Sequence, residues 1–122
     1  MVIKLKLINT SKIEIKKSQF YGYFYKIDNI TEIKEILKQL KIHHKKAKHI
    51  VYAYKFNNTA GKSDDKEPSG TAGTPLYNLL EMNNVQDSML VVVRYFGGIK
   101  LGAGPLMRTY KNCALQAMKK VN

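Results

Sequence analysis

The stretch VVVRYFGGIKLGAGPL, residues 91–106, runs from branched apolar residues directly into a loop with four glycines. The surrounding run SMLVVVRYF, residues 88–96, is typical of a buried strand, because branched apolar residues favour strands. After the glycines, apolar residues from Leu106 to Val121 recur at helical spacing and predict a terminal helix. A buried strand, a glycine-rich loop and a helix in direct succession form the centre of the predicted fold.

Two further strands and an amphipathic helix are predicted upstream. The runs FYGYFYKI (20–27) and HIVYAYKF (49–56) are rich in aromatic and branched residues, which favour strands. Between them, isoleucines and leucines in residues 30–40 recur at helical spacing, and Asn29 or Thr31 is placed to cap the helix. We expect this helix to cross between two strands.

The amino terminus is predicted to form a hairpin. Apolar residues alternate with lysines in residues 3–7, and with Lys12, Glu14 and Lys16 in residues 12–16. The polar residues 9–11, Asn-Thr-Ser, separate the two alternating runs and favour a turn.

A short helix is predicted after the long connection of residues 57–74. Thr74 can cap it, and Pro75 is favoured at a first helical position. With these elements, residues 1–122 are expected to form one α+β domain, a two-layer sandwich with helices on one face of a mixed sheet.

The composition favours a small domain with an anionic partner. A chain of 122 residues with 44% hydrophobic residues suits one core. The net charge is +12, of which residues 1–62 carry +10 and residues 63–122 carry +2. Clustered cations bind polyanions, although a chain rich in lysine, isoleucine and asparagine also arises from genome-wide base composition.

The single cysteine and the amino terminus favour a cytoplasmic protein. Cys113 has no partner for an internal disulfide and is predicted to be a core thiol. Lys4 and Lys6 interrupt the apolar residues at the amino terminus, which therefore lacks the pattern of a signal peptide or a membrane span.

The connection 57–74 contains a second unusual stretch, SDDKEPSGTAGTP (63–75). Loops beyond about 12–15 residues are uncommon unless they are functional or disordered. Here Pro68 restricts the backbone while Gly70 and Gly73 permit tight paths, so we expect an ordered loop. Because both motifs emerge from strands of one core, they are predicted to lie side by side at one end of the sheet.

Three cations flank the glycine-rich loop. Arg94 ends the strand, Lys100 lies within the loop, and Arg108 lies in the first part of the helix. The free amides and positive dipole of a helix start favour anions, so a phosphate is one candidate ligand. The glycine spacing matches neither the dinucleotide-binding nor the P-loop pattern.

The anion can also be internal. Asp64, Asp65 and Glu67 could fold over and neutralise the arginines, since most charge clusters are paired or solvated. Both alternatives predict that the acidic loop and the glycine-rich loop act together.

These two motifs resemble the hallmarks of the Impact/YigZ family, an acidic DDGEPSGTAG-type loop and an RYFGGIKLGAGGL-type loop. Lys66 and Pro105 stand where the family pattern has glycine. Ser18, Phe20, His44, Ala47, His49 and residues 52–54 also resemble the family's amino-terminal pattern. The candidate binding residues are Asp64, Asp65, Glu67, Ser69, Gly70, Thr71, Arg94, Tyr95, Phe96, Gly97, Gly98, Lys100, Gly102 and Arg108.

The resemblance implies a fold similar to domain IV of elongation factor G and to the carboxy-terminal domain of a small-subunit ribosomal protein. It also implies a role in translation, and eukaryotic members restrain a starvation-responsive kinase. Bacterial relatives usually carry a second, ferredoxin-like domain, so this chain is expected to be the family's core module.

Two other clusters have competing interpretations. His43, His44 and His49 lie in a basic stretch, for which a phosphate-facing role is favoured over metal binding. Tyr21 and its neighbours at every second residue can stack on bases, but such a stripe more often packs against a helix.

We therefore predict a translation-associated module that binds RNA or the ribosome. A protein-partner adaptor is the alternative, and a metal-assisted phosphate-handling enzyme is third, since neither motif supplies a His or Cys for catalysis. No cofactor, metal site or membrane association is predicted.

Overall fold

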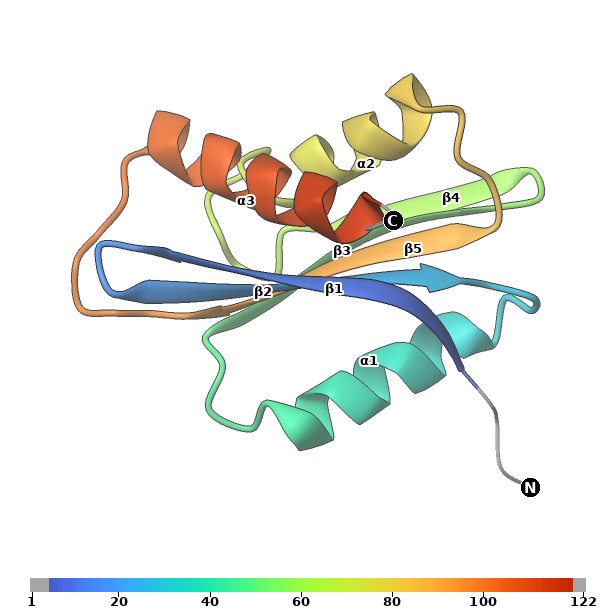
Figure 1. Cartoon of the computed structure of the whole chain (residues 1–122), viewed down its shortest axis with the longest axis horizontal. Helices are drawn as coiled ribbons and strands as arrows, with labels where there is room; N and C mark the ends of the chain where they lie inside the picture. The colour runs from blue at the N-terminus through green and yellow to red at the C-terminus, as the bar shows by residue number, and fades with distance from the viewer. Residues whose placement is uncertain (1–4, 120–122) are drawn as a thin grey trace.

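The computed structural model describes residues 5–119, which form one five-stranded sheet and three helices (Figure 1). The elements are β1 (Lys6–Ile15), β2 (Ser18–Lys26), α1 (Glu32–His43), β3 (His49–Phe56), β4 (Thr59–Ser63), α2 (Gly73–Met82), β5 (Ser88–Tyr95) and α3 (Ala103–Met118). The strand order is β1-β2-β5-β3-β4, and every neighbouring pair is antiparallel. The α+β class is confirmed, but the sheet is antiparallel and not mixed.

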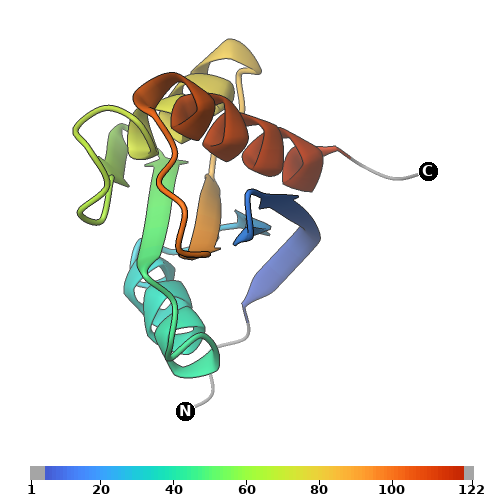
Figure 2. The ribbon, with the colours of Figure 1, turned by 90° about the vertical axis from the view of Figure 1, so that its left-hand side faces the viewer.

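Helices cover both faces of the sheet. Helices α2 and α3 lie on one face and α1 lies on the other, as Figure 2 shows from the end of the sheet. Leu90 and Val92 of the central strand β5 pack toward α2 and α3, whereas Met89, Val91 and Val93 pack toward α1. A strand that is apolar at successive positions is buried on both of its sides. Both faces of the sheet are therefore covered by helices, and the prediction that all helices lie on one face was wrong.

The first strand is continuous where a turn was predicted. Strand β1 passes through Asn9 and Ser11, and the hairpin to β2 turns at Lys16 and Lys17, whose φ angles are 45° and 69°. The Ser11 hydroxyl donates to the Cys113 carbonyl of α3 at 2.6 Å. Ser11, one of the polar residues that suggested a turn, therefore contacts a helix.

Helix α3 lies close to the first two strands. A Cβ at Gly22 would lie 2.3 Å from Ser11 Oγ and 2.9 Å from the Cys113 carbonyl oxygen, so this position requires glycine. Cys113 is fully buried there, which confirms the predicted core thiol. Val121, the last residue of the predicted apolar stripe, lies outside the described residues.

Strand β1 forms one edge of the sheet. A register shift between Leu7 and Asn9 interrupts its pairing with β2, and Leu7 and Ile8 are 47% and 44% exposed. Lys6 and Lys12 of this strand are also exposed.

The opposite edge, β4, lies inside the stretch that was expected to be one long loop. A turn at Asn57, with a φ of 53°, joins β3 to β4, and the two strands pair from Tyr52–Ser63 to Phe56–Thr59. The irregular part of the connection is therefore residues 64–72. None of the helices in the described range 5–119 is long and apolar enough to cross a lipid bilayer.

Candidate functional site

The two unusual motifs meet at a buried carboxylate. Glu67 accepts a hydrogen bond from Arg94 Nη1 at 2.7 Å and another from the Tyr110 hydroxyl at 2.5 Å. All three residues are buried, with Glu67 7% and Arg94 5% exposed. The acidic loop and the end of β5 are thus adjacent, as predicted.

Arg94 is held on several sides. Its Nη2 donates to Ser18 Oγ at 3.3 Å, and its guanidinium carbon lies 5.4 Å and 5.7 Å from the ring centroids of Phe20 and Phe96. Its Nε has no hydrogen-bond partner among residues 5–119. Ser18 Oγ also accepts from the Gly97 amide at 3.2 Å, so the same hydroxyl joins β2 to the glycine-rich loop.

His49 attaches the acidic loop to β3. Its Nδ1 lies 2.6 Å from the carbonyl oxygen of Asp65, so Nδ1 is the donor. Its Nε2 lies 3.4 Å from Glu67 Oε1. The imidazole therefore contacts two residues of the loop at once.

Asp64 organises the start of α2. One carboxylate oxygen accepts from the amides of Ala72 and Gly73 at 3.1 Å and 2.7 Å, and the other accepts from Gly70 at 2.9 Å. Burial acts to raise the pKa of Asp64, but the three amides and the charge of Lys62 outweigh it, and the pKa lies below its ordinary value. This carboxylate takes the capping role predicted for Thr74, which lies inside the helix.

Asp65 is also occupied within the fold. Its carboxylate accepts from the Ile50 amide of β3 at 2.6 Å. Asp65 and Lys66 have φ angles of 41° and 70°, so two residues with side chains occupy the left-handed region. The family pattern places glycine at Lys66, where this conformation costs least.

The glycine-rich loop, residues 97–102, lies against the β1–β2 turn. A Cβ at Gly97 would lie 2.1 Å from the carbonyl carbon of Lys17, so no other residue fits at this position. Gly98 adopts a φ of 87°, and the Gly102 carbonyl accepts the first turn's hydrogen bond from Leu106 at 2.9 Å. Pro105 lies in the first turn of α3, which tolerates proline.

Exposed cations surround this junction. A hollow of about 420 Å³ is lined on its polar side by Lys48, His49, Glu67, Arg94 and Lys100. We use the term basic rim for Lys17, Lys48, Lys66 and Lys100, which are all exposed and border the hollow or the adjoining loops. The acids of the site face inward while these lysines face solvent.

The remaining predicted residues lie at different depths. Arg108 is exposed, and its Nη1 lies against Gly104. It makes no ion pair with residues 5–119, so of the two arginines the acidic loop neutralises Arg94 and not Arg108. The Thr71 hydroxyl donates to the Pro68 carbonyl at 2.5 Å, whereas Ser69 is exposed.

Tyr95 belongs to the other face of the sheet. His44 Nδ1 lies 2.6 Å from the Tyr95 hydroxyl, and its Nε2 lies 2.6 Å from the Tyr23 hydroxyl. Burial, followed by the charge of His43, lowers the pKa of His44. The tyrosines of β2 thus pack on the side of the sheet that α1 covers. Residues 5–119 contain no group of three or more potential metal-binding side chains.

Sequence reasoning missed the role of Tyr110. This residue lies within the stripe predicted between Leu106 and Val121, for which only apolar packing was expected, and its hydroxyl binds Glu67, 43 positions away. A tyrosine at a core position of a helix carries no local signal for a buried polar partner.

The sequence pattern of the Impact N-terminal domain matches residues 16–118. The chain belongs to the Impact N-terminal domain family. Among curated relatives, IMPACT family member YvyE of Bacillus subtilis (strain 168) is 40% identical over 102 residues, covering 81% of this chain and 47% of that protein. IMPACT family member YigZ of Escherichia coli (strain K12) is 35% identical over 113 residues, covering 88% and 55%. This Impact-family chain spans about half the length of these relatives.

Solved structures share the fold of the Impact-family chain. The crystal structure of a hypothetical protein superposes with a TM-score of 0.83 at 33% identity, covering 96% of this chain and 61% of that one. The two-domain translational regulator Yih1 gives a TM-score of 0.55 at 20% identity, covering 96% and 48%. The second likeness shows the fold alone.

Proposed function

We propose that this Impact-family chain regulates translation by binding RNA, free or in the ribosome, through the basic rim and the start of α3. The observation that carries the proposal is the direction of the charges at the junction. Asp64 and Asp65 accept backbone amides and Glu67 accepts Arg94, while the four lysines of the basic rim point outward. Such a surface favours phosphates.

The role in translation is carried over from relatives. Yih1 is a translational regulator with the same fold. The family membership of this chain supports an equivalent role, and the basic rim supplies a surface on which such a role can act.

The cations have different roles in this proposal. Lys48, Lys100 and Arg108 are exposed and contact phosphates, and the free amides at the start of α3 add a favourable dipole. Arg94 is buried against Glu67, so it positions the loops and does not reach a ligand. These contacts fix the position of the nucleic acid without reading its bases.

A protein-partner adaptor is the second candidate, and a particular observation favours it. Phe96 and Ile99 are 47% and 42% exposed beside the basic rim. Aromatic and aliphatic side chains surrounded by polar residues are typical of protein interfaces.

Titration of a fluorescent single-stranded RNA of mixed sequence, at several salt concentrations, tests the first candidate. Lys48→Ala and Lys100→Ala are each expected to weaken binding to all sequences equally and to lower the salt slope by about 0.7, the value for one phosphate contact on a single strand. Lys38→Ala, an exposed lysine of α1 on the other face, is the control and is expected to leave the slope unchanged.

Folded rim variants that bind RNA as tightly as the parent, with the same salt slope, would contradict the proposal. A partner retained at high salt and lost on Phe96→Ser would favour the adaptor instead.

A further inference from the structure

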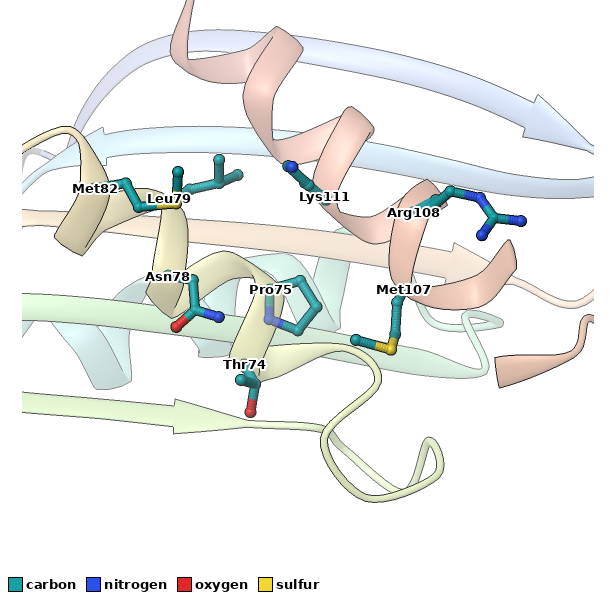
Figure 3. A pocket seen from close by; sticks show the side chains of 8 residues that line it. All are labelled: Thr74, Pro75, Asn78, Leu79, Met82, Met107, Arg108 and Lys111. Atoms are coloured by element: carbon teal, nitrogen blue, oxygen red, sulfur yellow. The ribbon is translucent and has the colours of Figure 1, made fainter. Parts of the chain in front are cut away.

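A second hollow lies between α2 and α3, on the outer side of the helical layer (Figure 3). Its volume is about 240 Å³, and it shares no lining residue with the hollow at the basic rim. We call it the interhelix groove, lined by Thr74, Pro75, Asn78, Leu79 and Met82 of α2 and by Met107, Arg108 and Lys111 of α3.

The apolar walls of the groove reach solvent. Met82 is 74% exposed and Met107 is 43% exposed, whereas Pro75 and Leu79 are buried beneath them. Figure 3 shows Met107 extending from α3 toward Pro75 of α2. Exposed methionines on a groove between helices are adaptable contacts for the apolar side chains of a bound peptide.

The groove is electropositive. Lys111 and Arg108 stand on its α3 wall, make no ion pair with residues 5–119, and face no acidic lining residue in that range. The acid of α2, Glu81, is directed elsewhere, since its carboxylate accepts the Tyr77 hydroxyl at 2.6 Å and lies 3.1 Å from Lys55 Nζ. An apolar surface beside two unneutralised cations is complementary to an acidic, amphipathic ligand.

We propose that the interhelix groove binds an acidic amphipathic segment of a partner protein. The segment inserts apolar side chains between Met82 and Met107 and directs carboxylates to Lys111 and Arg108. Nucleic acid has no aliphatic side chains to cover the methionines, and a second copy of a chain with net charge +12 would be repelled. The groove shares Arg108 with the phosphate-binding surface proposed above, and it shares no residue with the basic rim.

Methyl NMR of the whole chain labelled on methionine tests the proposal without any mutation. The probe is a synthetic peptide of about 16 residues with leucine at helical spacing and glutamate elsewhere. The methyl signals of Met82 and Met107 are expected to shift on titration, while that of Met89, which is fully buried under α1, stays in place as the internal control.

Variants of the peptide separate the apolar contribution to binding from the contribution of charge. Replacing the leucines of the peptide by serine is expected to weaken binding by about tenfold, because the apolar contact is lost. Replacing its glutamates by lysine is expected to abolish binding. Equal affinity for the leucine and serine peptides would overturn the proposal, since the groove would then be contributing only charge.

Variants of the protein give the reciprocal test. Lys111→Glu and Met107→Ser are each expected to weaken peptide binding by about fivefold, whereas Lys38→Glu, the same charge change on the opposite face, is expected to have no effect. Both groove positions are exposed, so folding is expected to persist.

Three further outcomes would overturn the proposal. The first is an absence of methyl shifts at millimolar peptide. The second is concentration-dependent shifts of Met82 and Met107 without peptide, which would indicate self-association. The third is shifts at these methyls caused by an RNA oligonucleotide and not by the peptide, which would make the groove part of a nucleic-acid surface.

Discussion

Glu67 and Arg94 are a buried ion pair in which each residue compensates the other. Glu67→Leu is expected to reduce the free energy of unfolding by about 3–5 kcal/mol, because it leaves the guanidinium of Arg94 buried without its carboxylate. Urea denaturation followed by circular dichroism measures the change.

The double variant Glu67→Leu/Arg94→Met serves as the control. It removes both charges and is expected to be more stable than Glu67→Leu alone. If Glu67→Leu lowers the free energy of unfolding by less than about 1 kcal/mol, water reaches the ion pair and screens it.

The contribution of the Asp64 carboxylate to stability can be tested through its dependence on pH. Asp64→Asn replaces an oxygen that accepts from Gly70 by an amide and is expected to cost about 2 kcal/mol at neutral pH. The folded-state pKa of Asp64 lies below its ordinary 3.8, so the unfolded state binds its proton first as the pH falls, and the carboxylate's contribution is lost below pH 3.8. The difference between parent and variant should therefore shrink in acid, and a constant difference from pH 7 to pH 3 would contradict this assignment.

Within the acidic loop, Lys66 adopts a φ of 70° that glycine accepts at lower cost. Lys66→Gly is expected to raise the free energy of unfolding by about 0.5–1 kcal/mol, after the greater flexibility of glycine in the unfolded chain is counted. Lys66→Ala removes the same charge but keeps the strained backbone, so thermal or urea denaturation should show no gain. Equal stabilisation by both variants would attribute the effect to charge.

At the end of α1, His44 links the helix to β2 and β5 through the hydroxyls of Tyr23 and Tyr95. His44→Gln is expected to cost about 1 kcal/mol at pH 8. Burial and His43 hold the folded-state pKa below its ordinary 6.5, so the unfolded state takes up the proton first and the parent loses stability as the pH falls below 6.5.

The difference in the free energy of unfolding between the parent and His44→Gln should become smaller from pH 8 to pH 5 in denaturation experiments. His43→Gln, an exposed neighbour, keeps both tyrosine contacts and serves as the comparison. A gap that widens in acid would reverse the inferred direction of the pKa change.

The elements with a strong local pattern were predicted well, and those shaped by distant contacts were not. Strand β3 spans the predicted residues 49–56, and β5 and α3 follow the predicted order around the glycines. Strand β4, with the sequence TAGKS, has no apolar alternation and is defined only by its pairing with β3. The pairing of Glu67 with Arg94 was one of two alternatives, because residues 27 positions apart leave no periodic signal.

Across the whole molecule, both cores share the central strand. Residues of β5 contribute to the cluster under α2 and α3 and to the cluster under α1. We expect one cooperative unfolding transition, with the amides of β5 exchanging most slowly and those of the edge strands β1 and β4 most rapidly. Native-state hydrogen exchange measures this order, and two separate transitions would show that the helical layers unfold independently.

The exposed edge of the sheet has a consequence for solubility. Strand β1 presents unpaired backbone groups beside the exposed Leu7 and Ile8, a combination that favours edge-to-edge aggregation. The register shift after Leu7 interrupts this edge, and the exposed Lys12 places a positive charge where the strand of another copy would have to dock, whereas Lys6 is paired with Asp28. A lysine that contributes to the positive charge of the domain thus also keeps copies of the chain apart, and acetylation of Lys12 is expected to make this edge more prone to pair with another copy.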